Sequence, residues 1–414
     1  MALVVQKYGG TSVGSTERIK LVADRVVRAR VKGDRVVVVV SAMAGETNRL
    51  FALANELSED PSARETDVLV ATGEQVSAAL LAIRLRALGY PTVSFLAYQL
   101  KIITDARHGG ARIKSIDGDR LLAALDAGNI AVVAGYQGIS PEGDITTLGR
   151  GASDLTAVAL AAVLKADACE IYTDVDGVYT ADPNICPSAR RLDHISYDEM
   201  LEMAGLGAKV LQLRSVELAR RYNVPLVVRS SFTDNGVGTR VSQEEKSMEE
   251  VLVSGVTLDH NQSKITLTGV EDRPGLAAKI FGPIADAGIV VDMIIQNAAA
   301  DGRTDLTFTV PRPDLRRALE LVGKVAGEIG SAAIRHEDQV AKVSIVGVGM
   351  RTHAGVAARM FAVLAAEAIN IEMIATSEIK VSVVVNAKYG ELAMRALHDA
   401  FVGDGSNINS SRPA

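Results

Sequence analysis

The sequence has no tryptophan, and aromatic residues make up only 4% of its 414 residues. Proteins that bind single-stranded nucleic acids usually stack bases on aromatic side chains, so this composition argues against that class. The formal net charge is −6, and the chain contains no block of five or more lysines and arginines. We therefore expect no nucleic-acid partner.

Cysteine and histidine are also scarce. The two cysteines, Cys169 and Cys186, form no CxxC motif, so we expect two reduced thiols in a cytoplasmic protein. The six histidines show no ligand spacing, and we assign neither a metal site nor a nucleophilic triad. They are His108, His194, His260, His336, His353 and His398.

Long apolar runs are absent as well. The longest, VVVVV at 36–40, has the length of a buried strand rather than the ~18–20 residues that cross a membrane. The N-terminus has neither the basic region nor the apolar core of a signal peptide. We therefore expect no membrane partner.

Apolar runs and helical patterns alternate from residue 1 to about residue 231. The runs are rich in Val and Ile and lie at 2–6, 36–40, 92–97, 130–135, 170–175 and 225–230. Strands that are buried on both faces of a parallel sheet have this composition. Two of the intervening segments have helical spacing, Ile19-Val22-Ala23-Val26 and Val76-Ala79-Leu80-Ile83. The sequence predicts an α/β domain with a mostly parallel central sheet covered by helices.

An internal repeat follows a polar stretch at 232–250, which we interpret as a domain boundary. KITLTGV (264–270) resembles KVSIVGV (342–348), and GLAAKIF (275–281) resembles GVAARMF (355–361). Each copy has the pattern of a βαββαβ unit, the ferredoxin-like fold. In the first copy we predict strands at 264–269, 289–295 and 304–310 and helices at 275–287 and 314–327. The predicted domains are therefore 1–245, 246–340 and 341–414.

The two copies differ in their last strand. The first copy closes with SAAIRHE (331–337), whereas the second ends in a tail-like segment. The strand VLVSGVTL (251–258) has no partner nearby in the sequence. We predict that this strand crosses over and completes the sheet of the second repeat, because an open edge would invite aggregation.

Small, hydroxyl and acidic residues follow the predicted strands. In open parallel sheets, ligands bind beyond the carboxyl ends of the strands. Gly9 and Gly10 follow the first run and would let backbone N–H groups approach an anion, with Lys7 just upstream. A plain turn with a solvated lysine is the alternative interpretation of this loop.

The loop LGRGASD (148–154) is more specific. Arg150 has no role in capping a helix, and a guanidinium in a glycine loop suits a carboxylate or a phosphate. Ser153 and Asp154 are alternatively simple N-caps of the next helix. Glu74, at another helix start, either faces a substrate ammonium or interacts favourably with the helix dipole.

Several motifs together resemble the bacterial aspartate kinase family, the aspartokinases. They are KYGGTSVG, SAM-GETN, ATGEQVSAALLA, the GRG-SD loop, YTDVDGVYTADP and AKVLQLRSVELA, in order along almost the whole chain. The resemblance implies the amino acid kinase fold followed by two ACT repeats. It also implies ATP-dependent phosphorylation of the side-chain carboxylate of L-aspartate, the first step towards lysine, threonine and methionine.

The resemblance also implies roles for single residues. Lys7 would contact the transferred phosphoryl group, Asp154 would organise that lysine, and Arg150 would grip an aspartate carboxylate. Substrate binding is implied for Thr47, Glu74, Arg150 and Ser153. Nucleotide binding is implied for Lys7, Gly9, Gly10, Ser41, Thr173, Asp174, Tyr179, Asp182 and Lys209. Ala152 departs from the family, which usually has glycine there, and this makes the geometry of the loop less certain.

Cofactors and partners follow from the same resemblance. ATP would act with Mg²⁺ held mainly through the phosphates. Lysine, threonine or both would bind the repeats as inhibitors, at positions that match Asp272, Ile294, Gln296, Asn370 and Ile371. A homo-oligomer and an assembly with a small regulatory subunit are both compatible with the family. The alternatives are a related kinase, such as a glutamate kinase, and a non-catalytic amino-acid sensor.

Overall fold

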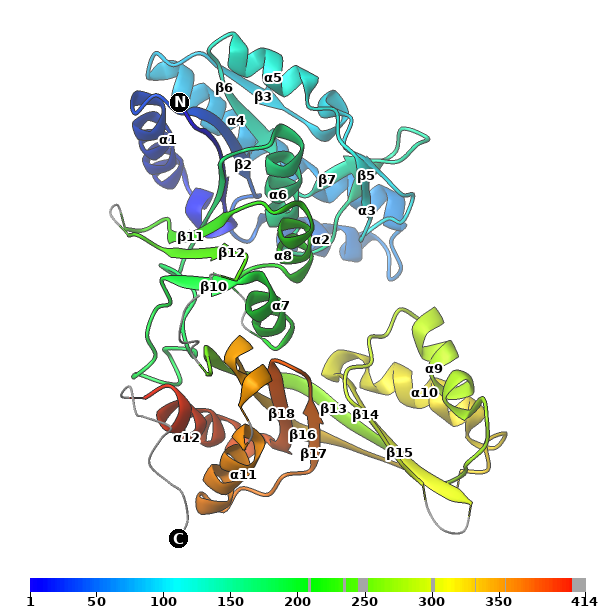
Figure 1. The fold of residues 1–414 in the computed structure, drawn as a ribbon. Helices are drawn as coiled ribbons and strands as arrows, with labels where there is room; N and C mark the ends of the chain where they lie inside the picture. The colour runs from blue at the N-terminus through cyan, green and yellow to red at the C-terminus, as the bar shows by residue number, and fades with distance from the viewer. Residues whose placement is uncertain are drawn as a thin grey trace. The chain divides into compact units, whose positions relative to one another are not determined.

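The computed structural model describes residues 1–207, 210–233, 236–244, 252–298, 302–331, 333–353 and 355–403. The chain forms two compact units, and each is described by itself (Figure 1). The N-terminal unit consists of Met1–Val178, Arg191–Ala204 and Lys209–Lys246. The C-terminal unit consists of Tyr179–Arg190, Gly205–Ala208 and Ser247–Ala414. The segment Tyr179–Arg190 thus belongs to the second unit, although the predicted boundary lies far beyond it.

An eight-stranded sheet forms the centre of the N-terminal unit, in the order β10-β12-β11-β9-β1-β2-β6-β3. Its neighbouring strands are parallel except for the antiparallel pair β11 and β12. Six strands lie at the predicted apolar runs: β1 (Leu3–Tyr8), β2 (Arg35–Val40), β3 (Thr92–Phe95), β6 (Ile130–Ala134), β9 (Ala168–Thr173) and β11 (Leu226–Ser230). The short strands β10 (His194–Ser196) and β12 (Thr239–Ser242) were not predicted. Because β12 belongs to this sheet, the stretch 232–250 is not wholly a linker.

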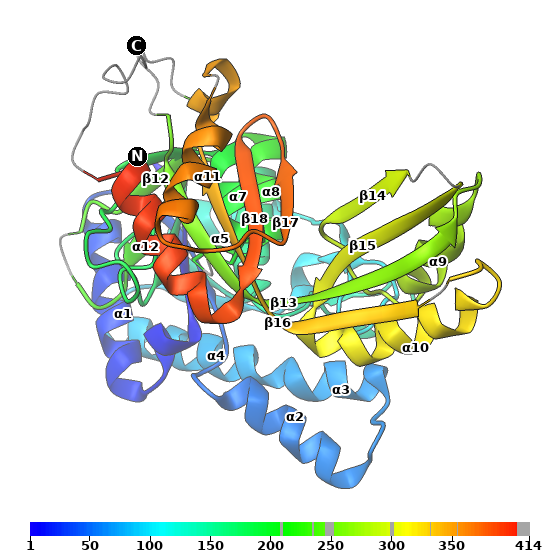
Figure 2. The ribbon, with the colours of Figure 1, turned by 90° about the horizontal axis from the view of Figure 1, so that it is seen from below.

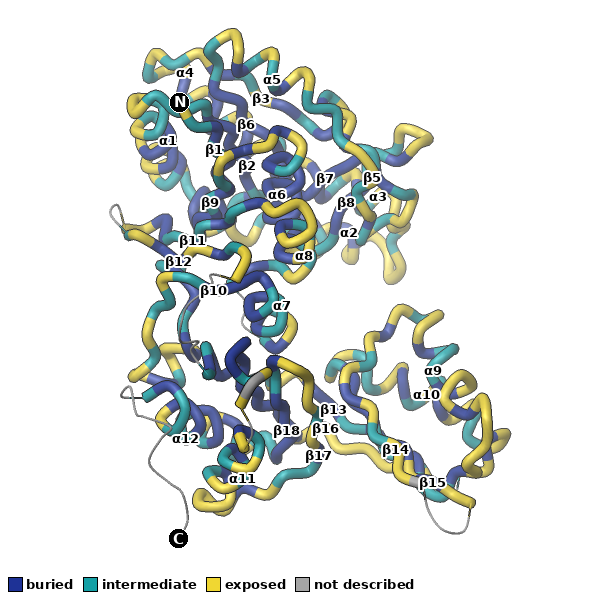
Figure 3. Tube along the Cα trace, viewed as in Figure 1, coloured by how far each residue is buried: buried dark blue, intermediate teal, exposed yellow. Residues whose placement is uncertain are grey.

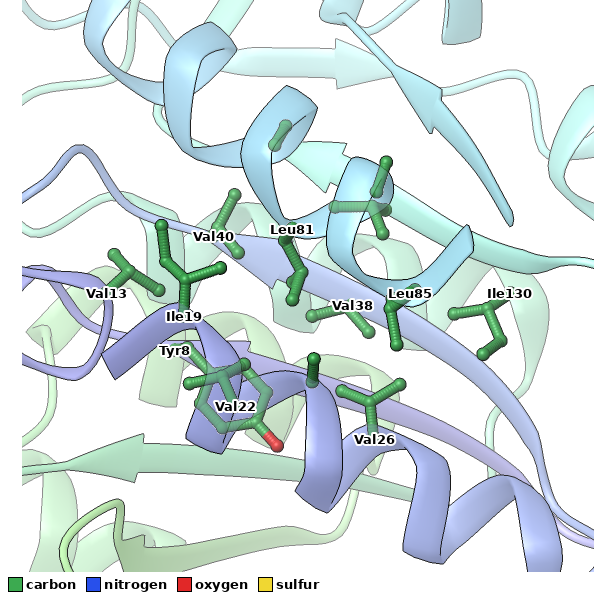
Figure 4. Packing of buried hydrophobic residues seen from close by; sticks show 14 of the residues in the cluster. Tyr8, Val13, Ile19, Val22, Val26, Val38, Val40, Leu81, Leu85 and Ile130 are labelled. Carbon is green, nitrogen blue, oxygen red and sulfur yellow. The ribbon is translucent and has the colours of Figure 1, made fainter. Parts of the chain in front are cut away.

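Helices α1 (Thr16–Val31) and α4 (Thr72–Ala87) pack against one face of this sheet (Figure 4). Ile19, Val22 and Val26 of α1 are buried there, as the spacing predicts. The spacing of the apolar residues predicts that Val76 and Ile83 lie on the inner face of α4. This prediction is wrong, because Val76 and Ile83 are 49% and 64% exposed. The buried face of α4 instead consists mainly of Gly, Ser and Ala residues and of the leucines at 81 and 85. The small residues let α4 pack close to its neighbours.

Helices α6 (Ser153–Leu164) and α8 (Leu213–Tyr222) lie against each other, and α6 contacts the other face of the sheet. The strands and α6 are buried along most of their length (Figure 3). A small second sheet has the order β5-β4-β7-β8. Its strands are β4 (Ile103–Thr104), β5 (Ile113–Ser115), β7 (Gln137–Ile139) and β8 (Ile145–Thr147). The other helices of this region are α2 (Glu46–Leu57), α3 (Ala63–Val70), α5 (Asp119–Asp126) and α7 (Tyr197–Gly205).

One helical stretch of the described residues, Ala63–Ala87, is long and apolar enough to cross a membrane by length and composition alone. Half of its most apolar window is buried inside the protein. It includes the buried carboxylates Asp67 and Glu74. We therefore assign this stretch, which spans α3 and α4, to the core of the N-terminal unit.

A six-stranded sheet forms the centre of the C-terminal unit, in the order β14-β15-β13-β16-β18-β17. Its strands are β13 (Gly255–Glu271), β14 (Ile294–Ala298), β15 (Arg303–Pro311), β16 (Ala333–Val346), β17 (Met373–Thr376) and β18 (Lys380–Asn386). Helices α9 (Leu276–Asp286) and α10 (Leu315–Ala326) cover the first repeat, and α11 (Val356–Ala366) and α12 (Gly390–Phe401) cover the second. The predicted strand at 289–295 begins later, at Ile294.

Two long strands serve both repeats (Figure 2). The sequence predicts separate strands at 251–258 and 264–269, and again at 331–337 and 342–348. The structure instead joins each pair into one strand, because neither 259–263 nor 338–341 contains a glycine or proline that would break the chain. The first part of β13, Gly255–Asp259, pairs with Val346–Lys342 beside the strands of the second repeat.

Two symmetric ion pairs also join the repeats. Lys264 of the first repeat contacts Glu372 of the second at 2.6 Å. Lys342 of the second repeat pairs with Asp292 of the first. The two lysines occupy equivalent positions in the repeat, and so do the two acids. Each repeat therefore supplies one cation and one anion to the other.

Candidate active site

Lys7 and Asp154 form the centre of the carboxyl-end rim of the main sheet. Lys7 lies near the end of β1, and its Nζ is 2.7 Å from Oδ1 of Asp154 in the first turn of α6. The side chains of Lys7 and Asp154 are only 11% and 9% exposed. A partly buried cation held by one carboxylate at the end of a strand is positioned to meet an anion that arrives from the rim.

The glycines after β1 allow close contacts that other residues would block. A Cβ atom on Gly9 would lie 3.4 Å from Nζ of Lys7, and one on Gly10 would lie 2.9 Å from the carbonyl oxygen of Ala42. The backbone N–H of Gly9 donates to the carbonyl of Tyr172. The loop therefore runs directly over Lys7, and it leads through a 3-10 turn into α1. This geometry supports a phosphate loop over a plain turn.

Glu74 is the second buried carboxylate of the rim. It lies in the first turn of α4 and is 3% exposed. Oε1 accepts a hydrogen bond from the backbone N–H of Ala42 at 3.0 Å, and Oε2 has no partner among the described residues. Burial raises the pKa of Glu74 to about 7, although the bond from Ala42 acts in the opposite direction. A buried carboxylate oxygen without a partner suits a cationic group of a ligand.

The glycine loop before α6 approaches helix α2. Arg150 is exposed, and its Nη2 lies 3.4 Å from Oδ1 of Asn48, the neighbour of the half-buried Thr47. Gly149 and Gly151 have φ values of +93° and +75°, which favour glycine. The structure thus brings Arg150 to the helix that carries Thr47.

Helix α6 does not use its predicted caps. Its N-cap residue is Ala152, without a side-chain cap, and Ser153 and Asp154 are buried in the first turn. The interpretation of Ser153 or Asp154 as a simple N-cap is therefore wrong. Ala152 itself has φ −76°, which any residue adopts, and its methyl packs in a buried cluster. The departure from glycine at this position does not strain the loop.

Asp67 was not predicted, although it holds the strand that leads to Arg150. It is 1% exposed and accepts hydrogen bonds from the backbone N–H and the hydroxyl of Thr147 and from the N–H of Gly109. Its other contact is Nδ1 of His108 at 3.1 Å. A single Asp on an apolar helix gives no motif, and only its position on the buried face of α3, three residues before Val70, could have indicated it.

Tyr136, two residues after the end of β6, is a second residue to which the sequence assigned no role. Its φ is +70°, a left-handed conformation that is uncommon outside glycine and often marks a functional site. Its N–H donates to Oγ1 of Thr156 on α6. Burial raises the pKa of Tyr136, and the charges of Glu74 and Asp67 add to this while Arg150 opposes it.

The predicted nucleotide residues lie in three different parts of the chain. At the rim, Ser41 follows β2, Thr173 is the last residue of β9 and Asp174 follows it; the hydroxyl of Thr173 donates to Asp174 at 3.1 Å. Tyr179 and Asp182 belong to the C-terminal unit, and Asp182 accepts two hydrogen bonds from Asn184. Lys209 lies outside the described residues.

The predicted effector residues fall into two groups. In the first repeat, Nε2 of Gln296 donates to Oδ1 of Asp272 at 3.3 Å, and Ile294 is 52% exposed at the start of β14. In the second repeat, Asn370 is exposed and Ile371 is half-buried just before β17. The structure thus joins Asp272 and Gln296 by a hydrogen bond, places Ile294 on the same strand as Gln296, and places the other two in the second repeat.

Sequence comparisons identify the parts of the chain. The profile of the amino acid kinase family matches residues 2–230, which is more than half of the chain, and ACT domain profiles match residues 264–327 and 343–401. The aspartokinase of Pseudomonas aeruginosa is 58% identical over 403 residues, which cover 97% of this chain and 98% of the relative. The aspartokinase of Thermus thermophilus is 52% identical over 403 residues, covering 97% of this chain and 99% of the relative.

Solved structures give the same result. E. coli aspartokinase III in complex with aspartate and ADP is 28% identical, with a TM-score of 0.81 over 97% of this chain and 100% of that one. The same enzyme in complex with lysine and aspartate has a TM-score of 0.76 over 96% of this chain and 99% of that one. The fold, the rim and the close relatives agree, and the chain belongs to the amino acid kinase family and, within it, to the aspartate kinases.

Proposed function

We propose that the rim around Lys7, Asp154 and Glu74 is the site at which this aspartate kinase transfers a phosphoryl group from MgATP to L-aspartate. The observation that carries the proposal is the pairing of a partly buried lysine under a glycine loop with a nearby buried carboxylate that lacks a partner on one oxygen. The lysine under the glycine loop suits the phosphates, and the buried carboxylate suits the ammonium of an amino acid.

Lys7 acts on the phosphoryl group. Phosphoryl transfer depends mainly on positioning and on stabilising the charge of the transition state. Asp154 holds the ammonium of Lys7 at 2.7 Å, so little reorganisation is needed when the phosphates arrive. The nucleophile is an ionised carboxylate, so the reaction needs no general base. Gly10 and Ser41 supply donors to the phosphates. The N–H of Gly9 is already bonded to the carbonyl of Tyr172, so Gly9 contributes through its lack of a side chain above Lys7.

Four residues bind aspartate. Glu74 faces the ammonium, and Arg150 captures a carboxylate in the bidentate manner that a guanidinium allows. Thr47 and Ser153 lie on the elements that flank Arg150 and add hydroxyl groups. Tyr136 and Asp67 hold the surrounding backbone. Thr173, Asp174, Tyr179, Asp182 and Lys209 remain our proposal for the nucleotide.

Mg²⁺ fits this site as a partner of the phosphates rather than of the protein. Asp154, the carboxylate nearest the phosphate loop, is already paired with Lys7. Among the described residues, the one group of three or more potential metal ligands is Cys186, His398 and Asp399, which lies in the other unit. When bound, Mg²⁺ would neutralise charge on the transferred phosphate.

Substrate choice tests the proposal. ADP release is measured with L-aspartate, L-glutamate and succinate, which lacks the ammonium group. We expect turnover with aspartate, much less with glutamate, and a loss of at least about tenfold in kcat/KM with succinate, since the bond from the ammonium to Glu74 is charge-assisted. In a Glu74→Ala variant, aspartate and succinate should be used with equally low kcat/KM. Equal use of succinate by the unaltered enzyme would refute the role of Glu74.

Feedback control through the ACT repeats is the second part of the proposal. Lysine, threonine or both bind near Asp272, Ile294 and Gln296 or near Asn370 and Ile371, and shift the chain between two arrangements of different activity. Inhibition by lysine and by threonine, alone and together, is measured for Gln296→Ala and Asn370→Ala. Each variant should keep its uninhibited rate. Unchanged inhibition in both variants would contradict these positions.

Feedback inhibition could also be tested by removing the repeats, that is, residues from 251 onward. Point variants are the better test, because this truncation would damage the remaining protein. Ala181 and Cys186 are buried in a hydrophobic cluster whose other members lie in the second repeat and in the segment that leads to it. Thr180 also contacts His398 of α12 at 2.8 Å. Removal of the repeats would expose this segment and would remove its core.

A further inference from the structure

A polar cavity of about 240 Å³ lies on the face of the main sheet that α1 covers. Its described lining comes from α1 and the residues just after it, from the facing side chains of β1, β9 and β11, and from Thr233 and Gly236 beyond β11. Successive side chains of a strand point to opposite faces, so Gln6 of β1 lines this cavity while its neighbour Lys7 reaches Asp154 of α6 on the other face. The cavity is therefore separate from the proposed active site.

Positive charge dominates this cavity. Among the described residues, its lining includes four cationic side chains, Arg25, Arg28, Lys32 and Arg229, and two acidic ones, Glu170 and Asp34. The balance of these described side chains is +2, in a chain whose formal net charge is −6. A cavity whose lining carries net positive charge concentrates small anions.

One of the two acidic groups, Glu170, is already committed. Oε2 of Glu170 accepts hydrogen bonds from Nε2 of Gln6 at 2.9 Å and from the hydroxyl of Tyr172 at 3.0 Å. Its Oε1 lies 3.5 Å from Nη2 of Arg229. The Nε atom of Arg229 is buried and has no hydrogen-bond partner among the described residues. Arg229 thus holds the carboxylate with one nitrogen and has a buried donor left over.

Arg25 gives the cavity a fixed wall. The residue is 9% exposed, and its Nη2 donates to the carbonyl of Thr233 at 2.8 Å. Its guanidinium also lies over the ring of Tyr172, with 5.0 Å to the ring centre. A held guanidinium loses little conformational freedom when a ligand binds. The exposed Arg28 and Lys32, one helical turn apart, extend the positive wall to the cavity mouth.

We propose that this cavity binds a compact oxyanion with two or more negative charges. Guanidinium and ammonium groups recognise phosphate and carboxylate groups alike. The cavity is smaller than the ~300–1,000 Å³ that is typical of sites for drug-sized ligands, so the ligand is small. The proposal does not depend on the reaction at the rim, because the two sites use opposite faces of β1.

Calorimetric titration with inorganic phosphate at low ionic strength tests the proposal on the full-length protein. Arg28→Gln and Lys32→Gln each remove one positive charge from an exposed lining residue. Lys20→Gln is the matched control, because Lys20 is an exposed residue of the same helix that does not line the cavity. Thermal midpoints of all variants are compared to show that the fold is kept. Citrate is titrated in parallel to distinguish carboxylate from phosphate ligands.

We expect saturable binding of phosphate or citrate to the unaltered protein and to Lys20→Gln with the same dissociation constant. Arg28→Gln and Lys32→Gln should each weaken it by about tenfold, the usual scale for one charge-assisted hydrogen bond. Phosphate that binds at the rim would be insensitive to both substitutions. Equal affinity in all four proteins, an equal loss in all three variants, or no saturable binding of either anion would overturn the proposal.

Discussion

Replacement of Glu74 by glutamine should stabilise the protein and weaken its binding of aspartate. Burial raises the pKa of this carboxyl group from its ordinary value of 4.5 to about 7. The folded state therefore holds the proton more tightly than the unfolded state. As the pH rises from about 4.5 to about 7, the unfolded state ionises first, so the free energy of unfolding falls through this window.

The size of the effect follows from the same pKa values. At 1.36 kcal/mol for each pH unit between 4.5 and about 7, ionised Glu74 costs the folded state up to ~3 kcal/mol above pH 7. Glutamine cannot ionise, and its carbonyl can still accept from Ala42. Its amide nitrogen would take the place of Oε2, which has no partner, and this reduces the gain. We expect a net stabilisation of about 1–3 kcal/mol at pH 8 and less at pH 5.

The functional effect has the opposite sign. Only ionised Glu74 attracts the ammonium of aspartate, so KM for aspartate in the unaltered enzyme should fall as the pH rises from 6 to 8, through the pKa of about 7. In Glu74→Gln, KM should be at least about tenfold higher at pH 8, and this dependence on pH should disappear. KM for ATP should change less than KM for aspartate, because Glu74 is assigned to the ammonium of aspartate and not to the phosphates.

Denaturant unfolding at pH 5 and pH 8 and steady-state kinetics over the same range measure both effects. Glu199→Gln is the control: Glu199 is also buried, but it accepts hydrogen bonds from Ser196, the last residue of β10. That substitution should destabilise the protein and leave KM for aspartate unchanged. The reasoning fails if Glu74→Gln changes stability equally at both pH values, or if its KM for aspartate is unaltered.

Three further predictions follow from the structure. Asp67→Asn should lower kcat/KM for aspartate by about tenfold, because an amide cannot accept all the hydrogen bonds that hold the strand before Arg150; unchanged kinetics would contradict this. Gly10→Ala should lower both kcat and the unfolding free energy, since its methyl would push the phosphate loop away from a backbone carbonyl 2.9 Å away, and a wild-type kcat would exclude that tight fit. Lys264→Glu and Glu372→Lys should each destabilise the C-terminal unit by about 1–3 kcal/mol, whereas the double exchange should restore part of the loss, because Glu337, 3.1 Å from Lys264, would still face a glutamate; additive losses in denaturant unfolding would refute the pairing.

The sequence predicted the strands and the rim well because their signals are local. Apolar runs of Val and Ile fix the buried strands, and glycines at 9 and 10 mark a close approach of the backbone. The rim then follows, since all these strands are parallel and end at one edge. Lys7 and Asp154 meet there although 147 positions separate them in the chain.

Other features depend on tertiary packing and left no local signal. The inner face of α4 is formed by small residues, so its large apolar residues, Val76 and Ile83, indicated the wrong side. Asp67 is identified only by the three N–H and O–H groups that converge on it. The segment Tyr179–Arg190 packs with the second repeat through contacts that are distant in sequence, such as that between Thr180 and His398.

The most direct test of the central claim is the kcat of Lys7→Ala, measured with L-aspartate and MgATP at saturation. The alanine leaves β1 and its neighbours in place, so circular dichroism and the thermal midpoint should show a folded protein. We predict a fall in kcat of at least ~100-fold, the usual scale for the loss of a donor that stabilises a transition state. A folded Lys7→Ala protein with a wild-type kcat would contradict the account.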